Sequence, residues 1–227
     1  MANALRHADA LLQKASRKAI AVGLNYVDHA KEMGSKADRI APIWFFKPST
    51  SYLAQNVGPI QIPPTAVAHY EVELGVVIGR PAKDVKASDA IKHIAGYVCA
   101  IDVTARNWQS EAKKLGRPWA IAKGCDTFLP LSNVLPPDSI TIDGQGVVDV
   151  NLYLDVNGER RQEGSTKDMI WTIPELIEHI SSHVTLEEWD LILTGTPSGV
   201  GEFRPGDKIK AGIEGLVEME FGAVARS

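Results

Sequence analysis

The sequence is divided into short apolar runs separated by glycine, proline and turn residues, a pattern typical of strands rather than of long helices. We expect strands at Ala19 to Leu24, Glu71 to Gly79 and Ile43 to Lys47, the last of them buried and stopped by Pro48. Another strand is expected in the apolar run YVCAIDV, which holds Asp102.

Two hairpins and three short helices complete the expected elements. Asn157-Gly158 suits a type I′ turn, and Glu214-Gly215 joins the last two strands. Helical segments are expected at residues 26–34, 106–116 and 173–183; Thr172 is the N-cap of the third. Because strands outnumber helices and several pair through hairpins, the sequence predicts a β-rich α+β domain over residues 19–227. Residues 1–18 are expected to be an N-terminal extension or helix.

Composition and charge exclude several classes of protein. Twenty-four Lys and Arg face 28 Asp and Glu, so nothing favours nucleic-acid binding. No run of about 18 apolar residues predicts a membrane span, and no G-x-G-x-x-G motif follows the first strand. Cys99 and Cys125 lack the spacing of a disulfide scaffold or zinc site, which indicates reduced core thiols in an intracellular protein.

The N-terminal segment leaves two interpretations open. Four basic residues and one acidic residue lie in residues 1–20, loosely as in a mitochondrial presequence; a first surface helix is the favoured alternative. We therefore expect the protein in the cytoplasm or the mitochondrion.

Three acidic residues suggest a metal site. Glu71 and Glu73 are two apart on a strand and so share one face, where a divalent cation would relieve their repulsion. Asp102, inside an apolar run, needs a partner and is the third candidate. Hard cations such as Mg²⁺ and Mn²⁺ prefer oxygen ligands. An exposed strand face is the simpler explanation for the two glutamates alone.

Two further features carry possible chemistry. His29 and Glu32 share one helical face, as a carboxylate-oriented general base requires, although a solvated surface pair has the same spacing. Lys123, in the apolar segment WAIAKG, either neutralises a buried acid or holds an anionic substrate.

Four motifs together resemble the fumarylacetoacetate hydrolase family: HYEVELGVVIGR, IDVTAR, PWAIAKG and ILTGTPSGVG. The likeness runs from about Ala19 to Phe221. The motifs GLNYVDHAKEM and FFKPST are similar to its small single-domain branch, which contains acylpyruvases that are also oxaloacetate decarboxylases, and bacterial dioate isomerases and decarboxylases. Leu24 departs from the GRNY common in that branch, which bears on substrate preference.

The resemblance implies a mixed β-sandwich roll of the family's C-terminal-domain type, a homodimer, and one Mg²⁺ or Mn²⁺ per subunit. It implies metal ligands at Glu71, Glu73 and Asp102, an active-site lysine at Lys123, a water-activating dyad of His29 and Glu32 on a lid, and substrate-binding or positioning residues at Arg106, Gln109 and Thr196.

The implied substrates are small 2-oxo acids such as acylpyruvates and oxaloacetate. The first expected reaction is Mg²⁺-dependent hydrolysis of the C–C bond of an acylpyruvate, with oxaloacetate decarboxylase activity. The alternative is an oxaloacetate or dioate enol–keto tautomerase, which does not require an activated water. A non-catalytic binding protein of this fold is the third possibility, and a missing metal ligand would have favoured it.

Overall fold

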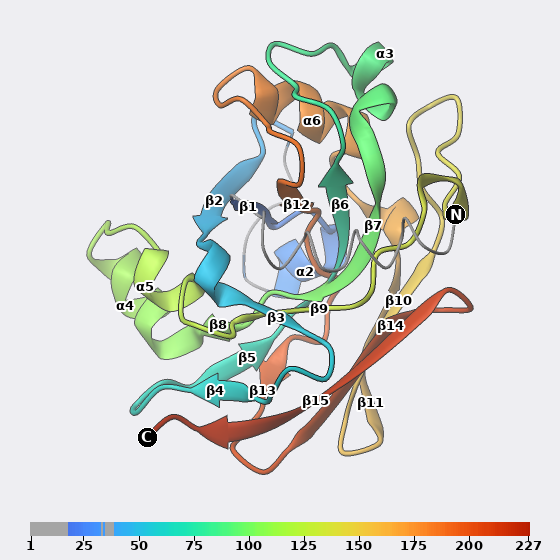
Figure 1. Cartoon of the computed structure of the whole chain (residues 1–227). Helices are drawn as coiled ribbons and strands as arrows, with labels where there is room; N and C mark the ends of the chain where they lie inside the picture. The colour runs from blue at the N-terminus through green and yellow to red at the C-terminus, as the bar shows by residue number, and fades with distance from the viewer. Residues whose placement is uncertain (1–17, 33, 35–38) are drawn as a thin grey trace.

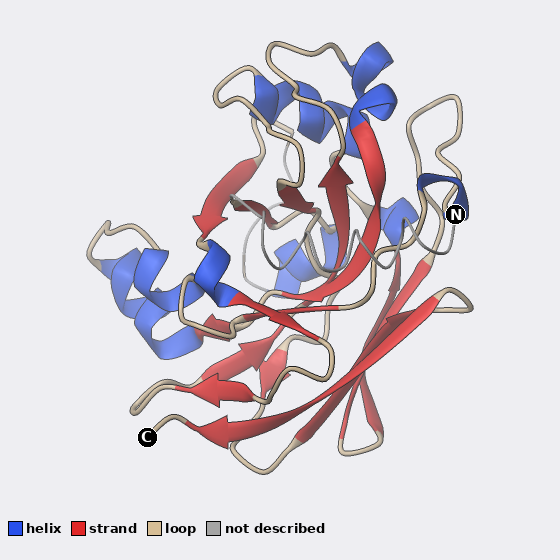
Figure 2. Cartoon of the chain, in the orientation of Figure 1, coloured by secondary structure: helices blue, strands red, loops and turns tan. Residues whose placement is uncertain are grey.

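The computed structural model describes residues 18–32, 34 and 39–227, and strands dominate it (Figures 1 and 2). The helices of this described part are short: α2 Val27–Glu32, α3 Ala87–Ala90, α4 Arg106–Lys114, α5 Ala120–Lys123 and α6 Ile173–Ser181. Single 3₁₀ turns lie at Ser49–Ser51, Ile91–His93, Pro137–Ser139 and Thr166–Asp168.

The strands of the described residues are β1 Ala19–Gly23, β2 Ile43–Lys47, β3 Tyr52–Ala54, β4 Ile60–Ile62, β5 Ala68–Tyr70, β6 Val72–Ile78, β7 Ile94–Ile101, β8 Thr104–Ala105, β9 Leu129–Leu131, β10 Asn151–Val156, β11 Glu159–Ser165, β12 Leu191–Leu193, β13 Gly201–Glu202, β14 Lys208–Ile213 and β15 Val217–Ala225. They form three sheets: a seven-stranded one (β2-β1-β12-β6-β7-β9-β3), a five-stranded one (β11-β10-β14-β15-β4) and a three-stranded one (β13-β5-β8). Parallel pairs (β1 with β12, β3 with β9, β4 with β15) occur among antiparallel ones, so the sheets are mixed.

The apolar core lies between the sheets and beneath α6. Alternate residues of β6 (Leu74, Val76 and Ile78) enter the main core cluster, which also receives Leu152 of β10 and Ile177 of α6. All of β6 is buried on both faces, which explains its apolar sequence. Gly75 is required at its centre, because an added Cβ there would lie 2.6 Å from the Val98 side chain of β7.

The expected fold class is confirmed: the domain is a β-rich mixed roll, and the expected hairpin turns are present. Asn157 and Gly158 both have positive φ (52° and 82°), as the type I′ turn requires. The N-cap is also found at Thr172, where its hydroxyl and backbone N–H both contact the Glu175 carboxylate.

Some expectations need correction. Residues 43–47 form an edge strand that is only partly buried: Ile43 and Phe46 are 49% and 46% exposed, since only β1 pairs with this strand. The helix that begins at Ile173 ends at Ser181, two residues early. Cys99 is buried but Cys125 only partly so, and both are free thiols. No helix in the described ranges is long and apolar enough to span a membrane. The expected N-terminal extension or helix, residues 1–18, lies outside the described part except for Lys18.

Candidate metal centre and active site

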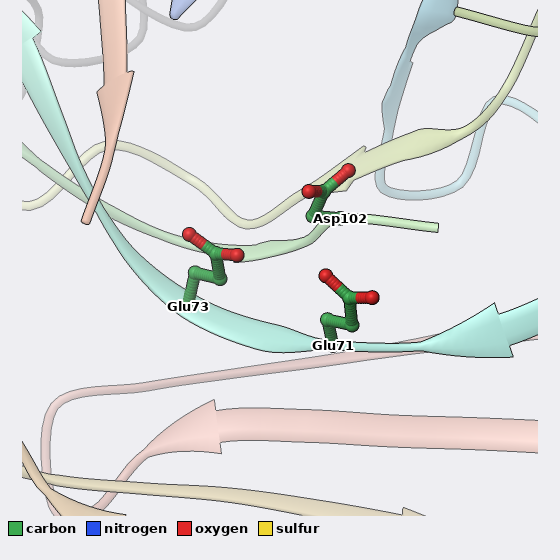
Figure 3. Close-up of side chains that lie close together, drawn as sticks. All are labelled: Glu71, Glu73 and Asp102. Atoms are coloured by element: carbon green, nitrogen blue, oxygen red, sulfur yellow. The ribbon is translucent and has the colours of Figure 1, made fainter. Parts of the chain in front are cut away.

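Three buried carboxylates meet where β6 and β7 lie side by side (Figure 3). Glu71 precedes β6, Glu73 is its second residue, and Asp102 follows β7. The Asp102 backbone N–H donates to the Glu71 carbonyl at 2.8 Å, which fixes the two residues across the strand pair. One oxygen from each carboxylate lies within 4.8 Å of the other two.

This donor set fits one hard divalent cation. Oxygens that each lie about 2.0–2.6 Å from a shared ion can be up to roughly 5 Å apart, and the three carboxylates satisfy that limit. Burial raises the pKa of Glu73 well above its usual range, and the charges of Asp102 and Glu71 raise it further. A cation between the three groups would relieve that cost. Their role as ligands stays a prediction.

Lys123, at the end of α5, bridges two of the acids. Its Nζ donates to Glu71 Oε2 at 2.8 Å and to Asp102 Oδ2 at 2.6 Å. Burial alone would lower the pKa of Lys123, but Asp102 and Glu71 raise it above its ordinary value. For Glu71 the effect of burial has the opposite sign and would raise the pKa. The charges of Lys123 and Arg106 bring that pKa well below its ordinary value instead. The lysine is therefore charged and neutralises buried acids.

Lys47 was missed in the sequence. It ends β2, is fully buried, and its Nζ donates to Asp102 Oδ1 at 2.7 Å and to the carbonyl oxygens of Val103 and Lys123. Asp102 therefore has two lysine partners, which answers the expectation that it needs one. The signal was present, because Lys47 stands in the apolar run IWFFK just as Asp102 stands in YVCAIDV.

We expect Lys47→Met to lower stability most when divalent cations are chelated. The change leaves the buried acids with less compensating charge, and breaking a buried ion pair from one side costs about 3–5 kcal/mol. A bound cation would offset part of that loss. Urea unfolding with EDTA and with Mg²⁺ measures both values, with exposed Lys92→Met as the control. Equal destabilisation in the two conditions would contradict a cation beside Asp102.

His29 of the His29–Glu32 pair lines the same pocket as the carboxylates. His29 is only 5% exposed and its Nδ1 is 3.0 Å from Glu32 Oε2, so it is not the solvated surface histidine of the simpler interpretation. Glu32 Oε1 accepts a hydrogen bond from the Gly199 N–H at 3.1 Å. Buried Asn25 anchors the start of α2 through three hydrogen bonds to Trp171 and Thr194.

Helix α4 contributes a polar stripe. Arg106, Gln109 and Lys113 follow the i, i+3, i+7 spacing of one helical face. Arg106 Nη1 donates to Gln109 Oε1 at 2.6 Å, and Arg106 Nη2 donates to Glu71 Oε1. These contacts tie the helix to the acidic cluster.

The TGTP loop after β12 also contributes to the pocket lining through Thr196. Gly195 has φ +98°, a conformation that glycine adopts without strain, and its N–H donates to Glu73 Oε2 at 2.6 Å. Thr196 is buried, and its hydroxyl accepts from Gln162 Nε2 at 2.8 Å. Gln162, on β11, was not predicted; its Oε1 also accepts from the Val72 N–H and so links the two sheets.

One pocket gathers the predicted site. Every predicted site residue except Glu32 lines it, and Glu32 contacts the lining through His29. The pocket is also lined by residues that were not predicted from the sequence: Val22, Gly23, Phe45, Lys113 and Trp119. Leu24, which stands where the related motif GRNY has arginine, also lines the pocket and has φ +58°.

Three acids that could hold a cation, a lysine and an oriented histidine line one pocket or contact its lining, an arrangement suited to an enzyme. Residues 18–224 match the family model described as fumarylacetoacetate (FAA) hydrolase C-terminal. The chain therefore belongs to the fumarylacetoacetate hydrolase family, and the resemblance carried by the four motifs is confirmed.

Relatives span nearly the whole chain. An oxaloacetate decarboxylase, mitochondrial, of Dictyostelium discoideum is 47% identical over 92% of this chain and 95% of that protein. The oxaloacetate tautomerase FAHD1, mitochondrial, of Oryza sativa subsp. japonica is 49% identical over 95% and 93%. A crystal structure of fumarylpyruvate hydrolase from Pseudomonas aeruginosa in complex with Mn²⁺ and pyruvate has a TM-score of 0.84 and 31% identity, covering 93% of this chain and 91% of that one.

Proposed function

We propose that this chain is a divalent-metal-dependent enzyme that interconverts the enol and keto forms of oxaloacetate. The observation that carries this proposal is the His29–Glu32 pair: a nearly buried histidine, oriented by a carboxylate, lines the same pocket as the three acids. Keto–enol exchange moves one proton between C3 and the 2-oxo oxygen, and an oriented imidazole is suited to that transfer.

Each group has a defined task in this reaction. Glu71, Glu73 and Asp102 would hold Mg²⁺ or Mn²⁺, which when bound supplies a Lewis acid that stabilises negative charge on the 2-oxo oxygen. The contact of Nδ1 with Glu32 leaves Nε2 of His29 free to exchange the C3 proton. Lys123 lines the same pocket and balances the charge of Glu71 and Asp102.

The relatives' names support this choice over the reaction expected first. Relatives from rice, Arabidopsis thaliana and human, 45–49% identical, are named oxaloacetate tautomerases. Several of these names include "mitochondrial", which supports the mitochondrial option for this chain. The homodimer stays a prediction.

Hydrolysis of acylpyruvates is the second candidate. The same His29 Nε2 could deprotonate a water instead of C3, and the fumarylpyruvate hydrolase that shares the fold was solved with Mn²⁺ and pyruvate. Decarboxylation of oxaloacetate needs no activated water, so it can accompany either reaction at the same site.

An NMR time course separates these activities. Enol-oxaloacetate, keto-oxaloacetate and acetylpyruvate are each followed with Mg²⁺, with Mn²⁺ and with EDTA. We expect fast loss of the enol signal with either cation and a fall of roughly 10²-fold or more in EDTA, because Lewis-acid stabilisation is worth several kcal/mol. If acetylpyruvate cleavage is much faster than enol loss, the second candidate replaces the first. A rate unchanged by EDTA would contradict both.

A further inference from the structure

Lys113 is a pocket-lining cation to which the mechanism above gives no task. It is the last member of the α4 stripe and lines the pocket that contains the acidic cluster. Arg106 is paired with Glu71, and Lys47 and Lys123 are paired with Asp102. Among the described residues, no carboxylate forms an ion pair with Lys113, so its charge is available to an anionic ligand.

Aromatic rings contact both this lysine and Lys123. The Lys113 ammonium lies 5.0 Å from the centroid of the Trp119 ring, and Trp119 packs edge-on against Phe45 at 5.6 Å between centroids. The Lys123 ammonium lies 4.9 Å from the centroid of the Phe45 ring. The pocket therefore has one lysine paired with the acidic cluster, Lys123, and a second, Lys113, that no carboxylate of the described residues pairs with.

This arrangement matches an anion with charge at both ends. We propose that Lys113 is the specificity residue that binds the second carboxylate of a four-carbon 2-oxo dicarboxylate, while the 2-oxo acid end lies at the acidic cluster. The proposal rests on the proposed function for its choice of substrate class. The cation–π contact with Trp119 holds the ammonium in place, which lowers the entropy lost when a carboxylate binds.

Leu24, Phe45 and Trp119 offer the opposing possibility. These apolar side chains also line the pocket and could receive an uncharged acyl chain. In that case Lys113 would only cover the Trp119 ring, and the terminal charge of the ligand would not matter. A pair of ligands that differ in that charge alone decides between the two.

Oxaloacetate and 2-oxobutyrate form such a pair, since 2-oxobutyrate has a methyl group in place of the second carboxylate. Their affinities for the Mg²⁺-loaded protein are measured by stopped-flow tryptophan fluorescence, before turnover. Lys113→Gln should weaken oxaloacetate binding by about 5- to 20-fold, a loss of affinity between those of buried and of exposed charged contacts. The same change should alter 2-oxobutyrate binding by less than about twofold. Lys113→Arg should retain most of the affinity for oxaloacetate. The neighbouring exposed Lys114→Gln, which does not line the pocket, is the matched control.

Each outcome is decisive. If Lys113→Gln weakens the binding of both ligands equally, or of neither, Lys113 does not bind the second carboxylate. Because binding is measured directly, the proposed function can fail separately: a wild-type protein that binds oxaloacetate through Lys113 but does not convert its enol form would keep this inference and remove the tautomerase proposal.

Discussion

Asp102→Asn is expected to reduce activity by about 10³-fold or more and to weaken Mg²⁺ binding, because a Lewis-acid cation contributes several kcal/mol to such reactions. Asparagine keeps the size of the side chain but removes the charge that one carboxylate gives to the cluster. Calorimetric titration with Mg²⁺ and the rate of enol-oxaloacetate loss measure the two effects.

The stability of the Asp102→Asn protein must be measured together with its Mg²⁺ affinity and activity, because Asp102 is also the buried partner of Lys47 and Lys123. Unfolding in urea with EDTA should show a loss that does not depend on the cation. Asp138→Asn, at an exposed turn, is the matched control. A folded Asp102→Asn protein with native Mg²⁺ affinity and more than about a tenth of the activity would remove Asp102 from the metal centre.

His29→Gln is expected to slow enol–keto exchange by roughly 10²–10⁴-fold, the usual contribution of a general base. If acetylpyruvate is cleaved, its hydrolysis should fall by a similar factor, because the same Nε2 would activate the water. Oxaloacetate decarboxylation should fall much less, since its C–C cleavage requires no base. Mg²⁺ affinity should stay native, because His29 is on α2 and the carboxylates are on or beside β6 and β7.

Comparing the three rates by NMR in one set of samples tests this role, with exposed His183→Gln as the control. If decarboxylation drops by the same factor as proton exchange, His29 positions the substrate or closes the pocket instead. That result would leave the chain without an assigned base and would contradict the tautomerase mechanism.

Local patterns were enough for much of the fold. The two-residue spacing of Glu71 and Glu73 predicted that their side chains lie on the same face of a strand. The Asn157-Gly158 pair predicted a tight hairpin turn. Burial of Asp102 followed from its apolar neighbours. These predictions depend on periodicity and turn chemistry, which neighbouring residues determine.

Long-range partners could not be found in this way. Lys47 reaches Asp102 because the curled sheet and α5 bring the end of an edge strand to the acidic cluster, and the strand order is not written in any local pattern. Gln162 supports Thr196 from a different sheet. The same limit explains why residues 43–47 were expected to be buried, since apolar composition does not show which strand is at the edge.

The most direct test of the account is the position of Mn²⁺ in crystals of the wild-type protein soaked with Mn²⁺ and oxalate. Anomalous scattering should place one ion about 2.0–2.6 Å from oxygens of Glu71, Glu73 and Asp102. Oxalate should complete its coordination on the side that faces His29. An ion held elsewhere, or one that contacts fewer than three of these carboxylates, would contradict the metal centre on which the proposed reaction depends.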